Sequence, residues 1–284
     1  MRYGFIGMGH LGKTLARRLI LVGTDLIVWN RTREKALDLG VPVAENPADL
    51  MRQVDVVFLN LFDSKAVDEV LTGLDGLFAV NCQGKVIIDL STNHFEDVVR
   101  FHTMARNRDA FYLECPVVGS VIPASQGALT ILVSGDPVAY AKVRDILEKL
   151  GKVIFYLGEP SRATRMKLVN NLVLGSFMAT IAEAVNLGEK SGIPRETVIE
   201  ILLSGAGNSM VLAAKREKLL KEDFSTHFSS ALIYKDLHYI QDLARMVKQP
   251  LFMASIAKEL YGMTYLHGTA GEDFSGVFTV LRKK

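Results

Sequence analysis

The sequence is poor in cysteine and has no motif typical of a metal site. Its two cysteines, Cys82 and Cys115, form no C-x-x-C pair, and no histidine or cysteine spacing matches a ligand pattern. These absences argue against a disulfide-stapled secreted domain and against a zinc module. We therefore expect no bound metal and a reducing, cytoplasmic setting.

The chain also lacks a large excess of charge of one sign. Its 33 basic residues nearly balance its 31 acidic residues and leave a formal net charge of +2. Lys and Arg are scattered along the chain rather than clustered. A nucleic-acid partner is therefore not expected.

Long apolar runs are missing as well. The longest uncharged stretch, Leu168 to Ala182, is shorter than a membrane span and contains Asn170, Asn171 and Thr180. Glycines interrupt residues 1–10, so we do not expect a signal peptide there. We expect no membrane attachment and interpret the uncharged stretch as a buried core helix.

The first half of the chain alternates short apolar runs with amphipathic segments. Strands are predicted at residues 3–7, 26–30, 56–61, 86–91, 111–115, 129–135 and 153–158. Helix start and stop signals mark segments 32–40, 46–51 and 136–151 between them. This alternation predicts a mostly parallel sheet wrapped by helices.

The second half has no convincing strand. Helices are predicted at residues 163–190, 194–204, 208–221, 229–248, 251–266 and 271–281. We therefore predict an α/β domain over 1–162 and an all-helical domain, used for substrate binding and dimerisation, over 163–284. Small residues along the first helix would let another helix approach closely, for instance from a second subunit.

A G-x-G-x-x-G motif lies between the first strand and the following helix. It comprises Gly7, Met8, Gly9, His10, Leu11 and Gly12. The first glycine permits a tight turn, the second lets the backbone approach a pyrophosphate, and the third lets helix pack on strand. The helix N-terminus then offers N–H groups to phosphates. The motif predicts a dinucleotide site in a Rossmann-type domain; the alternative is three structural glycines.

The second strand ends at Asn30, Arg31 and Thr32, followed by Arg33. An NAD-preferring site usually has an acid at this point to bind the ribose 2′-hydroxyl. A guanidinium and small polar side chains suit a 2′-phosphate instead. We predict NADP as the cofactor, with NAD less favoured. The alternative is that both arginines are solvated residues at a helix start.

Other strand ends carry further candidate residues. Ligands bind outside the carboxyl ends of strands in open parallel sheets. These ends are Leu61–Phe62, Ser91–Thr92 and Val117–Ser120. We expect cofactor and substrate contacts there, although Ser91–Thr92 can equally be a helix N-cap and Val118–Ser120 a plain turn.

Two polar features interrupt the apolar patterns of the helical half. Lys167 and Asn171 are four residues apart on one helix face, directly before and within the uncharged stretch. An amine beside apolar residues tends to have a lowered pKa, which suits proton transfer; the alternative is a lysine whose stem covers apolar surface. Asp236 falls inside the apolar stripe of segment 231–247, so it needs a partner, either structural or functional.

Four motifs, in this order along the chain, resemble those of the β-hydroxyacid dehydrogenase family. This family includes 3-hydroxyisobutyrate dehydrogenases, tartronate semialdehyde reductases and glyoxylate/succinic semialdehyde reductases. The motifs are the opening glycine turn, Asp89-Leu90-Ser91-Thr92, Lys167-Leu168-Val169-Asn170-Asn171 and Lys235-Asp236-Leu237. The resemblance covers essentially the whole chain.

The resemblance implies roles for these positions. Lys167 would be the general acid in reduction and the general base in oxidation, and Asn171 would orient the substrate. The other implied contacts are Thr92 beside nicotinamide and substrate, Lys235 on the cofactor, and Asp236 and Phe228 in the substrate pocket. The substrate would be a small 3- or 4-hydroxy acid or the matching aldehyde acid, and the chain would form a homodimer or homotetramer.

One departure from the family concerns the loop that binds the substrate carboxylate. The usual P-V-S-G-G is here Pro116-Val117-Val118-Gly119-Ser120, with a valine for the serine. Ser120 can supply a hydroxyl two residues later, so the acid substrate stays open. Two alternatives also stay open: an imine reductase of the same fold, against which Lys167 counts, and a non-catalytic NADP-binding interaction module.

Overall fold

The chain divides into two compact units in the computed structural model, which describes residues 1–282. The units are Met1–Lys167 and Leu168–Lys284. The division falls inside the first long helix of the second half, whereas the sequence pattern places the boundary at 162/163. The first turns of that helix belong to the first unit because side chains of the sheet hold them, as the hydrogen bonds described below show.

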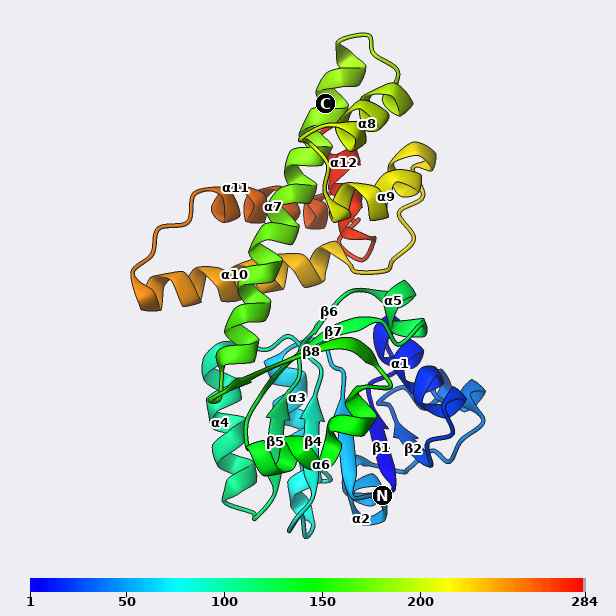
Figure 1. Ribbon diagram of the computed structural model, residues 1–284, viewed down its shortest axis with the longest axis vertical. Coiled ribbons are helices and arrows are strands. Elements are labelled where there is room, and N and C mark those ends of the chain that lie inside the picture. The colour runs from blue at the N-terminus through cyan, green and yellow to red at the C-terminus, as the bar shows by residue number, and fades with distance from the viewer. Residues whose placement is uncertain (283–284) are drawn as a thin grey trace. The chain divides into compact units, whose positions relative to one another are not determined.

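An eight-stranded sheet forms the centre of the first unit (Figure 1). Its strands are β1 (Tyr3–Ile6), β2 (Leu26–Trp29), β3 (Val56–Leu59), β4 (Val86–Asp89), β5 (Phe111–Glu114), β6 (Val117–Val118), β7 (Leu129–Ser134) and β8 (Gly151–Gly158). The order is β2-β1-β3-β4-β5-β7-β6, with β8 paired to β7. Strands β1 to β5 are parallel, and β7 runs antiparallel to β5 and β6. Each predicted run forms a strand, and the short β6 is additional.

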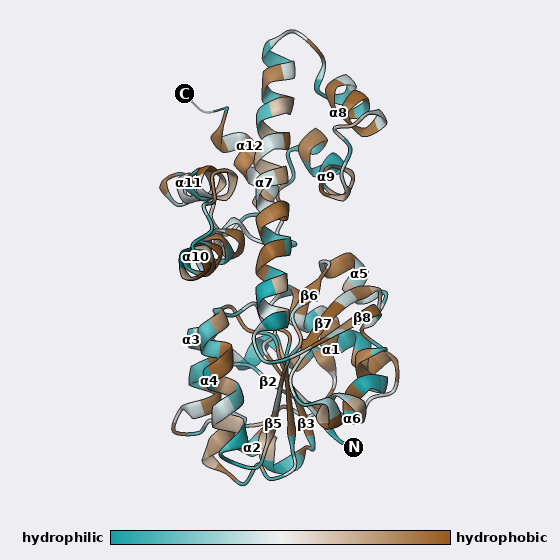
Figure 2. Ribbon diagram, turned by 60° about the vertical axis from the view of Figure 1, so that its left-hand side comes forward, coloured by the Kyte–Doolittle hydropathy of each residue, from teal (hydrophilic) through white to brown (hydrophobic). Residues whose placement is uncertain are grey.

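Helices cover both faces of the sheet. They are α1 (His10–Leu21), α2 (Pro47–Gln53), α3 (Ser64–Thr72), α4 (Phe95–Arg106), α5 (Val121–Ser125) and α6 (Pro137–Leu147). Phe5 packs in a core with α1 and α6, while its neighbour Ile6 packs in a core with α2, α3 and α4. Both faces are buried, as expected of a parallel sheet, and the strands are accordingly apolar (Figure 2).

The predicted helix at 32–40 is wrong. Two 3-10 turns stand in its place, η1 (Arg33–Lys35) and η2 (Leu37–Leu39), and Thr32 makes no side-chain cap. The backbone must return to the edge of β2 quickly, because Val28 pairs with Val43. Only Ala36 and Leu39 are buried in this segment, and a spacing of three suits the 3-10 turn.

The second unit is helical. Its helices are α7 (Arg162–Lys190), which starts in the first unit, α8 (Arg195–Ser204), α9 (Met210–Lys221), α10 (Ser230–Val247), α11 (Met253–Leu266) and α12 (Val277–Val280), with a 3-10 turn η4 (Phe274–Gly276). The single helix predicted at 271–281 is wrong, since η4 and α12 share that segment. Two of the small residues of α7 face helices of the same chain: a Cβ on Gly175 would lie 3.2 Å from Ile233 of α10, and one on Gly188 would lie 2.5 Å from Val198 of α8.

Helix α7 is long and apolar enough to span a membrane by length and composition, the one such helix in residues 1–282. Core helices of globular proteins meet the same criteria, and 44% of its most apolar window is buried inside the protein. Leu168, Met178 and Val185 are completely buried. The interpretation of this segment as a core helix agrees with that packing.

Candidate active site

The last residues of four parallel strands lie in one row across the sheet. Ile6 pairs with Leu59, Leu59 with Asp89, and Asp89 with Glu114. The glycine turn, the segment after β3, the loop after β4 and the chain after β5 therefore leave the sheet from the same edge. The predicted cofactor and substrate residues of the first unit are concentrated along this edge.

The three glycines of the opening turn have different roles. A Cβ on Gly7 would lie 2.2 Å from the carbonyl oxygen of Asn60, and one on Gly12 would lie 2.0 Å from the carbonyl oxygen of Gly7. Gly7 also has φ = +104°, where other residues are strained. At Gly9 a Cβ would meet nothing within 4 Å. Gly7 and Gly12 are required by the fold, whereas Gly9 leaves open space where a ligand can approach the backbone.

The start of helix α1 suits an anion. Gly9 occupies the N-cap position and brings no side chain to accept a hydrogen bond, and the first turn contains no acidic residue. Strands β2 and β3 flank β1 on opposite sides, so the chain reverses direction across the sheet at the β1/β3 junction. Ligands of open α/β sheets bind at such a junction, and the glycine turn lies there.

Asn30 links the end of β2 to the glycine turn. Its Oδ1 accepts a hydrogen bond from the Met8 amide at 2.8 Å, and its Nδ2 donates to the Thr32 carbonyl at 2.7 Å. Both polar atoms are thus used inside the protein. Arg31 and Thr32 are exposed beside this link, and Arg33 Nη1 donates to the Ala44 carbonyl at 3.3 Å. Arg31 and Arg33 are thus both exposed cations at this strand end, and Arg33 is tied to the Ala44 carbonyl.

The loop after β4 is fixed by a buried acid. Asp89 accepts hydrogen bonds from the Ser91 amide at 2.8 Å, from Asn93 Nδ2 at 2.7 Å and from the Tyr112 hydroxyl. Burial raises the pKa of Asp89, although these hydrogen bonds oppose the shift. Ser91 Oγ accepts from the Leu61 amide at 2.9 Å, which joins the ends of β3 and β4.

Ser91 and Thr92 do not cap helix α4, whose N-cap is His94. Thr92 is half-buried at the strand edge, and Phe62 is 48% exposed beside Leu61. These positions agree with the predicted cofactor contacts, which remain predictions.

The departing loop after β5 contains Val118, Gly119 and Ser120. Val118 pairs with Thr130 in the β6–β7 ladder. Gly119 has φ = +124°, and a Cβ there would lie 2.6 Å from Leu129 Cδ2, so only glycine fits. Ser120 precedes α5, and α5 packs against α1. The loop predicted to bind the substrate carboxylate therefore leads into α5, which packs against α1, the helix that starts at the glycine turn.

Lys167 is buried on α7, with 7% of its surface exposed. The first turn of this helix is bonded to the sheet, since the Thr164 amide donates to Glu114 Oε2 at 2.8 Å. Lys167 thus follows a turn that is anchored at the same strand edge as Asp89. Residues 1–167 form one compact unit, so this placement lies within the first unit.

In the second unit, the buried Asn171 and Asp236 form one group with the partly buried Lys235. Asn171 Nδ2 donates to Asp236 Oδ2 at 2.6 Å, and Lys235 Nζ lies 3.0 Å from Asp236 Oδ1. Asn171 Oδ1 accepts from Asn170 Nδ2 at 3.0 Å. Asp236 has the partners that its place in an apolar stripe requires, and it fixes the orientation of the Asn171 amide.

Phe228 is not part of that group. It lies before α10, where its amide donates to Asp273 Oδ2 at 3.2 Å and its ring packs edge-on against Phe274. Burial opposes ionisation of Asp273, yet its pKa is lowered by the buried amine of Lys215 and by Ser275. This ion pair sets the position of the Phe228 segment.

Sequence reasoning missed Glu114 and Asp273, and used Asp89 only as part of a motif. Each is a buried acid within or beside an apolar run. The rule that predicted a partner for Asp236 applies equally to them. The signal was therefore present, although the partners themselves were not predictable.

Comparisons with known proteins agree with this geometry. Residues 2–158 match the family model described as the NAD binding domain of 6-phosphogluconate dehydrogenase, and residues 161–281 match that of NADP-dependent 3-hydroxyisobutyrate dehydrogenase. The chain is 34% identical to glyoxylate/succinic semialdehyde reductase 2, chloroplastic, of Arabidopsis thaliana, over 98% of the chain and 79% of that protein. The chain belongs to the β-hydroxyacid dehydrogenase family.

Two further relatives bear on function. The chain is 33% identical to the cytokine-like nuclear factor N-PAC of Xenopus tropicalis over 98% of its own length, but it spans only 52% of that protein. The solved structure of Psf3 in complex with NADP+ and 2-OPP is 31% identical, with a TM-score of 0.90 and coverage of 98% of this chain and 99% of that one.

Membership of the β-hydroxyacid dehydrogenase family confirms the predicted fold class and enzyme class. The chain is an NAD(P)-dependent oxidoreductase acting on hydroxyl donors. The predicted cofactor, NADP, is confirmed by the NADP-dependent family model. The open backbone at Gly9 and the absence of an acid at Asn30–Thr32 fit that cofactor.

Proposed function

We propose that the chain transfers a hydride between NADP and a small 3- or 4-hydroxy acid or its aldehyde acid, with Lys167 as the general acid and base. Candidate substrates are 3-hydroxyisobutyrate, succinic semialdehyde and glyoxylate. The observation that supports this most is the buried amine of Lys167, on a helix whose first turn is bonded to the strand edge that carries the glycine turn.

The first unit supplies the cofactor contacts in this proposal. The backbone at Gly9 and the first turn of α1 bind the pyrophosphate, and Arg31 and Thr32 bind the 2′-phosphate. Leu61, Phe62 and Thr92 flank the nicotinamide half, and Lys235 of α10 adds a cofactor contact. When bound, NADPH supplies the hydride that reduces the carbonyl carbon.

Proton transfer is assigned to Lys167. Its ammonium gives a proton to the substrate oxygen during reduction, and its neutral amine takes one back during oxidation. Asn171 lies one helical turn later on the same face and orients the substrate, because Asp236 holds its amide in one position. Asp236 and Phe228 complete the pocket.

The substrate carboxylate is assigned to the backbone N–H groups of Gly119 and Ser120. Val118 offers no hydroxyl where the family usually has a serine, so Ser120 is the nearest alternative donor. The name of the Arabidopsis thaliana relative supports glyoxylate and succinic semialdehyde as first candidates.

A panel of small aldehyde acids tests this function. Glyoxylate, succinic semialdehyde and tartronate semialdehyde are each assayed with NADPH and with NADH, by the loss of nicotinamide absorbance. We expect turnover of at least one acid, faster with NADPH. Activity on cyclic imines alone would indicate an imine reductase, and tight NADPH binding without any turnover would indicate a non-catalytic module.

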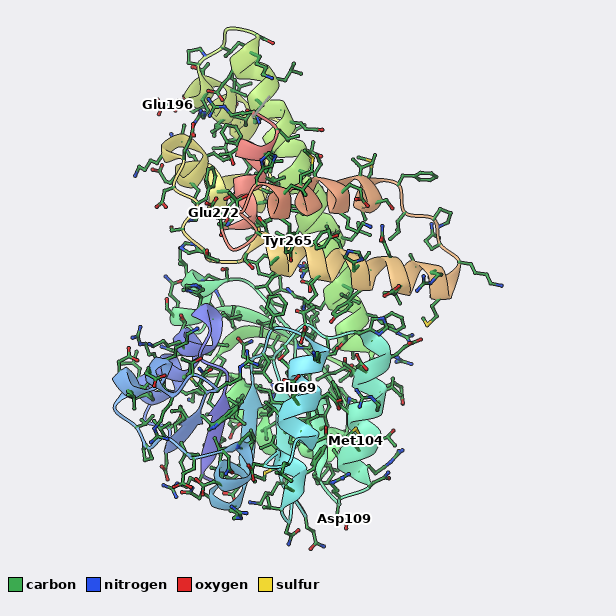
Figure 3. All side chains as sticks on the ribbon, turned by 180° about the vertical axis from the view of Figure 1, so that it is seen from behind. Glu69, Met104, Asp109, Glu196, Tyr265 and Glu272 are labelled. Carbon is green, nitrogen blue, oxygen red and sulfur yellow. The ribbon has the colours of Figure 1, made fainter. Side chains whose placement is uncertain are left out.

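We also propose a homodimer or homotetramer located in the cytoplasm. Val169, Val173 and Phe177 recur every four residues on α7 and are 48%, 43% and 47% exposed, which makes an apolar stripe. Tyr265, which Figure 3 labels on α11, adds an exposed aromatic ring of the same unit. Both cysteines are free and buried, which suits a reducing compartment. Light scattering of the purified protein gives the subunit number; a monomer would exclude this assembly.

A further inference from the structure

We infer that Glu114 is a positioning residue for the reaction: it holds the first turn of α7 on the sheet and so sets the place of Lys167. The inference rests on the proposed role of Lys167. Glu114 is the last residue of β5 and is 1% exposed.

The hydrogen bonds that the Glu114 carboxylate accepts come from the start of α7. Its Oε2 accepts hydrogen bonds from the amide of Thr164, at 2.8 Å, and from the hydroxyl of Thr164. Its Oε1 accepts from the amide of Ser161. Ser134, which pairs with Glu114 in the sheet, accepts from the Ala163 amide at 3.0 Å. Two sheet residues thus bind three backbone N–H groups at the start of the helix.

This cap differs from an ordinary one. Helix α6 is capped by its own N-cap residue Asp136, which accepts from the amides of Val138 and Ala139. For α7, Ser161 precedes the helix, but its Oγ is buried and has no hydrogen-bond partner among residues 1–282. Ser161 also has φ = +75°, a strained conformation for a residue other than glycine. The cap comes from Glu114 instead, so it ties the helix to the sheet.

The helix transmits this anchor to Lys167. Thr164, Lys167 and Asn171 are spaced by three and four residues, so they lie on one face of α7. Because each residue of a helix turns by about 100° and rises about 1.5 Å, a slip of one residue at Thr164 would turn Lys167 off that face. A misplacement of about 1 Å can cost about 100-fold in rate.

A carboxylate is required at position 114 because both of its oxygens act as acceptors in every hydrogen bond that the side chain forms. A glutamine would keep the shape but would point an N–H₂ group at one of the helix donors. The negative charge also lies at the positive end of the α7 dipole. His102 Nε2 lies 3.7 Å from Glu114 Oε1, which is beyond hydrogen-bond distance.

Glu114→Gln and Asp136→Asn make a matched pair for the test. Each turns a capping carboxylate into an amide at a helix start, but only α7 carries Lys167. We measure kcat, KM, the pH profile of kcat, NADPH affinity and the thermal midpoint. Glu114→Gln is expected to lower kcat by about 10- to 100-fold with NADPH affinity unchanged, while Asp136→Asn lowers the thermal midpoint only.

Substitutions of Thr164 give a second test, which can be carried out even if the Glu114→Gln variant does not fold. Thr164→Ser keeps the hydroxyl donor and should retain the parent kcat, whereas Thr164→Val should lower kcat by several-fold. A parent kcat and pH profile in Glu114→Gln, or equal kcat in both Thr164 variants, would overturn the inference. Lys167→Met separates the two failures: if it also keeps the parent kcat, the proposed function itself is wrong.

Discussion

The strand edge of the first unit offers mainly backbone groups to a ligand, whereas the polar group of the second unit consists of side chains. At the strand edge, the glycine turn presents backbone: Gly7 and Gly12 have no room for a side chain, and Gly9 leaves open space. In the second unit, Asn171 and Asp236 present buried side chains that are paired with each other and with the partly buried Lys235. A backbone site is damaged by adding atoms, and a paired side-chain group is damaged by removing them.

Lys167 is the last residue of the first unit and lies on α7, the helix that also carries Asn171. It is anchored through Glu114 to the strand edge, and it shares a helix face with Asn171. The comparison therefore predicts three kinds of variant: those that remove the chemistry, those that unfold a unit, and those that change cofactor binding alone.

The largest effect is expected for Lys167→Met. Loss of the general acid should lower kcat by about 10²- to 10⁴-fold, because no other group replaces its proton. NADPH affinity should stay at the parent value, since the glycine turn is untouched. Steady-state kinetics and a fluorescence titration with NADPH measure the two effects. A kcat near the parent value would remove Lys167 from the mechanism.

Asp236→Ala should cause the next largest effect, mainly on stability. It leaves the Lys235 amine and the Asn171 amide without their partner, and breaking a buried pair costs about 3–5 kcal/mol. The free energy of unfolding from urea titration measures this. Asp236→Asn is the matched control, because its amide oxygen still accepts from Asn171. Equal losses in both variants would show that the charge accounts for the whole effect and that the hydrogen bond to Asn171 adds nothing, whereas an unchanged Asp236→Asn would show that the charge of Asp236 is not needed.

The glycine turn offers a pair of substitutions with opposite signatures. Gly12→Ala should lower the thermal midpoint, since its Cβ would lie 2.0 Å from the Gly7 carbonyl. Gly9→Ala should leave the midpoint unchanged and weaken NADPH binding by about 10-fold or more, since its methyl group occupies the space of the pyrophosphate. Unchanged NADPH affinity in Gly9→Ala would place the cofactor elsewhere.

Arg31→Ala should have the smallest effect. Loss of one exposed cation near the 2′-phosphate should weaken NADPH binding by about 10-fold and leave NADH binding unchanged. The ratio of the two dissociation constants is the measurement, with Arg33→Ala as a control, because Arg33 donates to the Ala44 carbonyl. An equal loss for both cofactors would contradict the role of Arg31.

Local patterns predicted much of this structure. The seven apolar runs and the glycine motif are sufficient for the sheet and the turn, because strand and turn preferences act over a few residues. The pattern at 32–40 predicted a helix, since nothing local signals that Val43 must return to Val28. The two residues of β6 are too few to make a periodic signal.

The candidate site was predictable only in part. Asp236 was predicted to need a partner, yet its pairing with Asn171 depends on how α7 and α10 cross. Glu114 was missed because its partners, Ser161 and Thr164, are 47 and 50 residues away. Buried polar residues are visible in a sequence, whereas their partners follow from tertiary packing.

A structure of the chain with NADP+ and a bound hydroxy acid tests the central claim most directly. The quantity of interest is the distance from Lys167 Nζ to the reacting oxygen. We predict hydrogen-bond reach, about 2.6–3.2 Å, with the pyrophosphate at Gly9. An Nζ that points into solvent, away from the bound acid in every copy, would contradict the assignment of Lys167.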